Sequence, residues 1–140
     1  MTDITFFVPG IPRPGGSKRG FFNAKLKRVI ITEDNKRSKD WRASVAQAAS
    51  EAVEQALDGP LRARFEFVMP RPRGHYGKRG TLKSNAPLYH HIRPDATKLV
   101  RSTEDALKGI IWRDDSQIVT QHATKRYGEQ PGALITVSPV

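Results

Sequence analysis

The chain has 140 residues, which suits one compact domain over residues 1–140, and its net charge of +10 favours nucleic acid over an anionic membrane as partner. It has no cysteine, which excludes a disulfide framework or a thiolate-bound metal and fits a reducing compartment. No apolar run approaches the roughly 20 residues of a membrane span, and the N-terminus lacks a signal-peptide pattern, so we expect a cytoplasmic protein with no membrane partner.

The N-terminal segment predicts a strand, a loop and a hairpin. β-Branched and aromatic residues at 4–8 indicate the strand, and the Pro- and Gly-rich segment after it indicates the loop. Residues 16–18 read Gly-Ser-Lys. A phosphate-binding loop instead requires Gly-Lys-Ser or Gly-Lys-Thr at the start of a helix, so that motif is excluded. Apolar residues at 21–22 and 29–31 predict the hairpin.

A helix and a strand are expected next. Ser38 is placed to cap a helix over residues 39–57, and Asp58-Gly59-Pro60 is placed to end it. Its apolar face has three- and four-residue spacing and consists of Trp41, Val45, Ala48, Ala52 and Ala56. Residues 61–69 predict a strand, because small and aromatic residues alternate with charged ones.

Residues 70–92 carry Pro, Gly, Arg, Lys and Asn without periodicity, which predicts a mobile basic loop. Between Leu61 and Arg101 there are ten Lys and Arg against two acidic residues. Such a run is commonly a solvated face, but this one leads directly into an acidic segment, which favours a nucleic-acid surface. The four histidines do not have the spacing of a metal motif, so no zinc site is expected.

The last third of the chain predicts a second helix and three strands. The helix covers residues 97–107, with Gly109 placed to end it. Its inward residues are expected to be Leu99, Val100, Thr103, Ala106 and Leu107. The strands are expected at residues 110–112, 118–119 and 133–137.

This second helix lies between two groups of acidic residues. Asp95 precedes it, and the pair Asp114 and Asp115 follows it at the entry to a strand. The chain must return along the helix for Asp95 to meet Asp115, so their proximity is an inference from topology. Converging carboxylates form a hard oxygen site suited to Mg²⁺ or Mn²⁺, and Lys98 and Arg101 are placed to neutralise a phosphate under attack.

Simpler interpretations of the same residues stay open. Asp95 or Thr97 is placed to act as an N-cap. Asp114 and Asp115 fit an ordinary acidic turn, and Arg101 with Asp105 has the spacing of an i,i+4 surface ion pair. Each interpretation suffices for its own residues, so the case for a nuclease depends on their combination.

The combination Pro-Asp-x-x-Lys-Leu-x-Arg from Pro94, Asp-Ala-Leu-x-Gly from Asp105 and Asp-Asp-Ser-Gln-Ile-Val from Asp114 resembles the RusA family of Holliday junction resolvases. The resemblance implies a small α+β domain, with a mixed sheet of four to five strands and two main helices on one side. It also implies a homodimer in a bacterial or phage-infected cell that cuts four-way DNA junctions by paired nicks. Magnesium held by aspartates would support the cleavage, with Mn²⁺ as a possible substitute.

The resemblance assigns roles to particular residues. Asp95 and Asp115 match catalytic, metal-binding aspartates, and Asp114 matches the acidic neighbour. Arg101 stands where the family usually has a functional lysine, and its planar guanidinium differs from a compact ammonium. The family pattern is Asp-x-Asp, whereas this chain has Asp95-Ala96-Thr97. One alternative is that Asp95, Asp114 and Asp115 suffice to bind one ion, with Thr97 as a neutral metal ligand or a cap, and activity is retained. The other is that the protein binds junctions and cuts them poorly.

DNA contacts are expected from the basic loop and the N-terminal hairpin, mostly to phosphates and therefore sensitive to salt. The expected residues are Lys18, Arg19, Arg71, Arg73, Lys78, Arg79 and Lys83, with Lys25, Lys27 and Arg28 beside them. Phe21, Phe22 or Tyr76 is a candidate to insert at the open junction centre, and core packing is the alternative role for the two phenylalanines. Two other classes compete with the nuclease: a non-catalytic DNA- or RNA-binding module, and a ribosome-associated or other RNA-interacting protein.

Overall fold

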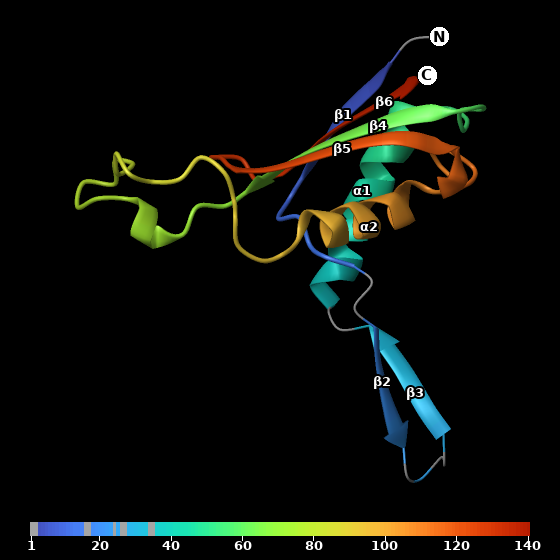
Figure 1. Ribbon diagram of the computed structural model, residues 1–140, viewed down its shortest axis with the longest axis horizontal. Coiled ribbons are helices and arrows are strands. Elements are labelled where there is room, and N and C mark those ends of the chain that lie inside the picture. Colours follow the sequence, from blue (N-terminus) through green and yellow to red (C-terminus); the bar gives the residue numbers. More distant parts are fainter. Residues whose placement is uncertain (1–2, 16–17, 24, 26–27, 34–35) are drawn as a thin grey trace.

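The computed structural model describes residues 3–15, 18–23, 25, 28–33 and 36–140, with side chains described for 3–15, 25 and 36–140 (Figure 1). The elements are β1 (Ile4–Pro9), β2 (Lys18–Asn23), β3 (Arg28–Glu33), α1 (Lys36–Ala52), β4 (Leu61–Met69), α2 (Ala96–Leu107), β5 (Ile118–Tyr127) and β6 (Gly132–Pro139). Short 3₁₀ turns occur at Arg73–His75 and Asp115–Gln117. No described helix has the length and apolar character that crossing a membrane requires.

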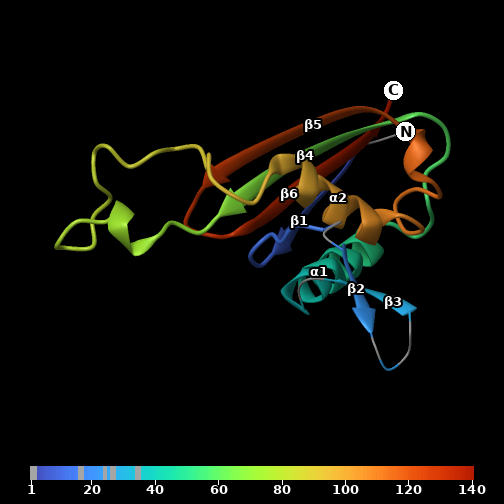
Figure 2. The ribbon, with the colours of Figure 1, turned by 60° about the horizontal axis from the view of Figure 1, so that its bottom comes forward.

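Four strands form one mixed sheet in the order β1-β6-β4-β5. The pairs β1–β6 and β4–β6 are antiparallel, whereas β4 and β5 are parallel. A parallel pair needs a long crossover, and here the crossover contains α2. Figures 1 and 2 show α1 and α2 on the same side of this sheet. The expected α+β fold, with two helices on one side of a mixed sheet, is therefore confirmed.

The predicted hairpin is also confirmed. β2 and β3 pair antiparallel as a separate two-stranded sheet. The side chains of Lys18, Arg19, Phe21 and Phe22 lie outside the described residues. The roles expected of them in DNA binding or packing therefore remain predictions.

The core lies between the sheet and the two helices. β4 follows its predicted alternation, with Ala63, Phe65 and Phe67 buried toward the helices. The helices meet through a polar contact at the centre of this core, because Trp41 Nε1 donates to Thr103 Oγ1 at 3.2 Å. The Thr103 hydroxyl in turn donates to the Leu99 carbonyl at 2.8 Å, so this buried hydroxyl both accepts and donates a hydrogen bond.

The first helix differs from its prediction at both ends. It begins at Lys36, so Ser38 lies in the first turn and is not the cap. The Ser38 hydroxyl instead donates to the Pro14 carbonyl at 2.6 Å and fixes the N-terminal loop. The helix ends at Ala52 because the chain turns away: the Leu57 amide donates to the Ile111 carbonyl at 2.7 Å.

The strand predictions at the C-terminal side need two corrections. Residues 109–111 form a turn in which φ of Gly109 is +86° and the Gly109 amide donates to the Trp112 carbonyl. Trp112 makes isolated bridges to Leu57 and Lys108 and belongs to no strand. The apolar side chains of residues 110–112 reflect burial rather than strand structure. The strand predicted at 118–119 continues to Tyr127. The prediction is too short because β5 is an edge strand, and its exposed polar residues do not alternate with apolar ones.

Residues 70–92, here called the arm, project from the end of the sheet (Figure 1). Their base is fastened to β5, because the Tyr127 amide donates to the Leu88 carbonyl and the His90 amide to the Lys125 carbonyl. The rings of His75 and His90 meet the Tyr127 ring edge-on, at centroid distances of 4.9 and 5.1 Å. The base of the predicted basic loop is therefore ordered by specific contacts.

Candidate functional site

Asp95 occupies the N-cap position of α2, but its carboxylate does not cap the helix. Its backbone carbonyl accepts the Leu99 amide, and no capping hydrogen bond reaches its side chain. The carboxylate is 61% exposed, and Lys98 Nζ lies 4.0 Å from it. Capping therefore does not account for an aspartate at this position, and the carboxylate faces solvent where a ligand can reach it.

Asp95 borders a cavity of about 480 Å³ between the N-terminal loop and the start of α2, here called the Asp95 cavity. Its lining residues are Ile11, Pro12, Arg13, Pro14, Met69, Arg93, Pro94, Asp95 and Lys98. Lys125 supports this region, because its ammonium donates to the carbonyls of Ile92 and Pro94 at 2.8 Å each. Burial lowers the pKa of Lys125, while the nearby Asp95 charge acts to raise it.

Asp115 borders a second cavity, of about 400 Å³, here called the Asp115 cavity. Its lining residues are Ala96, Thr97, Val100, Arg101, Glu104, Asp105, Asp115, Gln121 and Ala123. Thr97, Arg101 and Glu104 follow one another at spacings of four and three residues, which places them on one face of α2. The structure thus brings Thr97, Arg101 and Asp115 together, while Asp95 and Lys98 border the neighbouring cavity.

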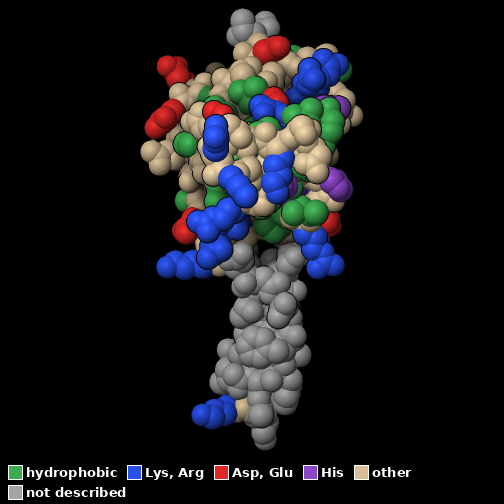
Figure 3. Space-filling model, turned by 90° about the vertical axis from the view of Figure 1, so that its left-hand side faces the viewer, with side chains coloured by type: hydrophobic (Ala, Val, Ile, Leu, Met, Phe, Trp, Pro, Cys, Tyr) green, Lys and Arg blue, Asp and Glu red, His purple; other side chains and the backbone are tan. Residues whose placement is uncertain are grey.

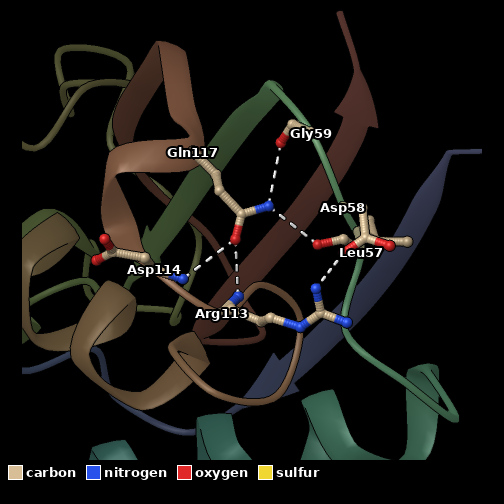
Figure 4. Close-up of polar contacts among 6 residues, drawn as sticks. All are labelled: Leu57, Asp58, Gly59, Arg113, Asp114 and Gln117. Atoms are coloured by element: carbon tan, nitrogen blue, oxygen red, sulfur yellow. Dashed lines mark hydrogen bonds and ion pairs between the residues drawn. The ribbon is translucent and has the colours of Figure 1, made fainter.

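The turn that carries the acidic pair is held by Gln117 (Figure 4). Its side-chain oxygen accepts the amides of Arg113 and Asp114 at 2.9 and 3.1 Å. Its side-chain nitrogen donates to the carbonyls of Leu57 and Gly59 at 3.0 Å each. One glutamine therefore fixes this turn to the chain entering β4.

The two aspartates of the pair have different surroundings. Trp112, whose ring is fully buried, donates its Nε1–H to Asp115 Oδ1 at 2.8 Å and so orients this carboxylate. Asp114 is exposed and accepts the Ser116 hydroxyl at 2.8 Å, which is the main reason that its pKa is lowered. Lys108 lies 3.9 Å from Asp114 and lowers the pKa further. Metal binding by Asp114 stays a prediction.

Glu104 is a candidate residue that the sequence reasoning missed. It is half-buried beside Asp115 and accepts a hydrogen bond from Gln121 Nε2 at 3.0 Å. Burial raises its pKa first, and the charges of Asp115 and Asp105 raise it further. Its spacing of seven residues from Thr97 is the signal that could have found it, because it places both on the same helix face. Among the described residues, no three acidic or histidine side chains lie close enough to hold a metal by themselves.

The predicted DNA-binding residues of the arm divide into two kinds. Arg71 is partly buried, lies 5.2 Å over the Tyr127 ring and donates to the Pro87 carbonyl, so it holds the base of the arm. The others are exposed, namely Arg73, Lys78, Arg79 and Lys83. Viewed from the free end of the arm, Lys and Arg side chains gather on one face with apolar side chains and histidines (Figure 3). Such a face suits a polyanion.

A family model matches the part of the chain that contains these motifs and most of the fold. The model of the family "Endodeoxyribonuclease RusA" matches residues 10–138, so the chain belongs to the RusA endodeoxyribonuclease family, a family of Holliday junction resolvase-type endonucleases that act on junction DNA. It is also 29% identical over 144 residues to the uncharacterized protein YqaN of Bacillus subtilis strain 168. That match covers 100% of this chain and 99% of YqaN.

Glu104→Gln tests the electrostatics of the Asp115 cavity. Since the folded state raises the pKa of Glu104 above its ordinary value of 4.5, ionised Glu104 destabilises the fold at neutral pH. The variant should exceed the wild type in free energy of unfolding by up to about 1 kcal/mol at pH 7, a value reduced by solvent screening. The difference should shrink as pH falls and vanish well below 4.5, where Glu104 is protonated in both the folded and the unfolded state.

Urea unfolding between pH 4 and 8 measures this difference. Glu54→Gln is the matched control, because it makes the same chemical change at an exposed position outside the cavity. A Glu104→Gln variant that is no more stable than the wild type at pH 7 would contradict the raised pKa of Glu104, to which burial contributes most and the neighbouring carboxylates contribute less.

Proposed function

We propose that this protein is a Mg²⁺-dependent endonuclease that resolves four-way DNA junctions by paired symmetric nicks as a homodimer. One observation carries the proposal. The first turns of α2 separate a cavity containing Asp95 and Lys98 from a cavity containing Asp115 and Arg101. Acidic and cationic groups suited to phosphodiester hydrolysis therefore lie on both sides of a single helix, within a chain of the RusA family.

The donor atoms at α2 fit magnesium. Asp95, Asp115 and the hydroxyl of Thr97 offer only oxygen, which is the preferred donor of a hard divalent cation. Magnesium keeps several waters and binds substrate phosphates, so one or two protein carboxylates suffice for it. When bound, the ion would polarise the phosphate and lower the pKa of a water molecule. The orienting bond from Trp112 to Asp115 would hold one ligand in place.

The cations act on the phosphate itself. Arg101 lines the Asp115 cavity, where its planar guanidinium suits a bidentate contact to phosphate oxygens. Lys98 lines the Asp95 cavity, and its ammonium lies 4.0 Å from the Asp95 carboxylate. It can therefore stabilise the negative charge of a phosphate bound beside Asp95. Charge stabilisation of this kind, aimed at the developing transition state, is commonly a large term in catalysis.

Cleavage of a labelled four-way junction tests the function directly, with linear duplex as the substrate control. We expect paired nicks on the junction alone, lost with EDTA. Asp95→Asn and Asp115→Asn should each reduce the cleavage rate roughly 100-fold or more, because an amide is a poor magnesium ligand. Junction binding without metal should persist. Asp3→Asn changes an exposed aspartate just before β1, outside both cavities, and this control should cut at the wild-type rate.

The second candidate function is a non-catalytic junction-binding protein, favoured by Thr97 where the family has a carboxylate. Tight junction binding without nicks in Mg²⁺ or Mn²⁺ would establish it. A preference for RNA over branched DNA would contradict both candidates and indicate an RNA-binding protein.

Thr97→Asp tests whether Thr97 suffices at the metal site or whether the missing carboxylate limits metal binding and cleavage. A carboxylate restores one negative charge to the Asp115 cavity, so we expect faster cleavage or a lower Mg²⁺ requirement. Cleavage rates across a magnesium titration measure the effect. Thr97→Asn is the matched control, since asparagine has nearly the same shape as aspartate without the charge. If Thr97→Asp changes neither the rate nor the magnesium requirement, position 97 does not limit metal binding.

The arm should supply phosphate contacts. Lys78→Ala combined with Arg79→Ala should weaken junction binding. The negative slope of log affinity against log salt should become less steep by about 0.9 for each phosphate that the protein no longer neutralises. Arg62→Ala with Arg64→Ala removes the same charge from exposed positions on β4 and is the matched control. Electrophoretic binding measured from 50 to 200 mM salt reads out the slope. An unchanged slope would remove these two residues from the DNA interface.

A further inference from the structure

We propose that the Asp95 cavity binds one unstacked nucleotide of the DNA strand at the branch point. In this arrangement the base lies against the apolar wall formed by Ile11, Pro12 and Met69, and a phosphate of the same strand lies against Arg13. The inference rests on the proposed function and extends it, since it assigns the structural feature by which the protein would distinguish a junction from a duplex.

The size and composition of the cavity fit a nucleotide. Its volume of about 480 Å³ lies within the roughly 300–1,000 Å³ of small-molecule sites. Ile11, Pro12 and Met69 give it an apolar wall, while Arg13, Arg93 and Lys98 contribute cationic groups. A free phosphate would leave the apolar wall uncovered, and an apolar ligand would offer no anion to the three cationic side chains, which outnumber the single carboxylate of Asp95. A nucleotide satisfies both parts of the cavity.

The loop that carries Arg13 is fastened to both helices. The Ser102 hydroxyl donates to the Arg13 carbonyl at 2.5 Å, and the Gly15 amide donates to the Lys98 carbonyl at 3.0 Å. Ser38 binds the carbonyl of Pro14, between them. A Cβ at Gly15 would lie 2.7 Å from Ser102 Cβ, so glycine allows this close approach. Because the loop is already ordered, binding a ligand at Arg13 sacrifices little backbone entropy.

The position of the cavity links it to the proposed chemistry. Asp95 lies on its border, and Lys125 fixes the chain on either side of Arg93 through the carbonyls of Ile92 and Pro94. A nucleotide seated here would place its strand beside the Asp95 carboxylate. Extruding a base costs least where stacking is already interrupted, as at a branch point. A pocket for one extruded nucleotide would therefore favour branched DNA over continuous duplex.

Fluorescence of 2-aminopurine tests the inference in EDTA, where binding proceeds without cleavage. The probe is placed in turn at each nucleotide around the branch point of an immobile four-way junction and in a matched duplex. We expect wild-type protein to increase the emission several-fold at one position of the junction, because stacked 2-aminopurine is quenched and the wall residues named above carry no aromatic ring. The emission of the probe in the matched duplex should not increase.

Two variants connect the signal to the cavity. Ile11→Trp fills the cavity from a residue that is 40% exposed, and it should abolish the increase. Val119→Trp makes a comparable substitution at an apolar residue that is 60% exposed and lies outside the cavity, and it should keep the increase. Arg13→Ala should weaken junction binding about tenfold, whereas Arg13→Lys should recover part of the loss. Arg62→Ala is the control for charge.

The outcomes separate this inference from the function on which it rests. A bright position is a probe position at which the wild-type protein increases the emission. The nucleotide pocket is supported if Ile11→Trp removes this increase and Arg13→Ala weakens binding more than Arg62→Ala does. A wild-type protein that cuts junctions with no bright position overturns the pocket and leaves the function standing. A bright position that survives in both cavity variants also overturns it. Failure of the wild type to bind junctions overturns both the proposed function and this inference. Binding with a bright position but no cleavage overturns the endonuclease function and leaves the nucleotide pocket standing.

Discussion

The seating of α2 against α1 and the sheet is the constraint on which both cavities depend. Leu99, Thr103 and Leu107 are fully buried, and the bond from Trp41 to Thr103 fixes the rotation of the helix about its axis. With that face fixed, Lys98 is directed to one cavity and Arg101 to the other. A shift of one residue would turn these side chains by about 100°, so the core determines where the charged groups lie.

The sequence predicts elements well where one face is buried and the other is exposed. The alternation of β4 and the spacing of α2 both have this origin, and both elements lie where the sequence predicts them. Only two residues of β5 are predicted, because it lies at the edge of the sheet with polar residues along most of its length. Trp112 leads to a wrong strand prediction for the opposite reason, because its apolar side chain is buried although the residue belongs to no strand.

The sequence predicts only those residues of the candidate site that belong to short motifs. Asp95, Lys98, Arg101 and Asp115 follow from motifs, but their division between two cavities follows from the packing of α2. Arg13 reaches the site from the loop after β1, and Lys125 from β5. No local pattern connects positions so far apart in sequence, so only the fold reveals that they share one surface.

Tyr127 joins the base of the arm to β5. Its ring contacts His75, His90 and Arg71 at the base of the arm, and its amide binds the chain at Leu88. Two residues earlier on β5, Lys125 holds the backbone just before Asp95. The base of the arm and the chain that positions this carboxylate are therefore attached to the same end of β5, through Tyr127 and Lys125 respectively.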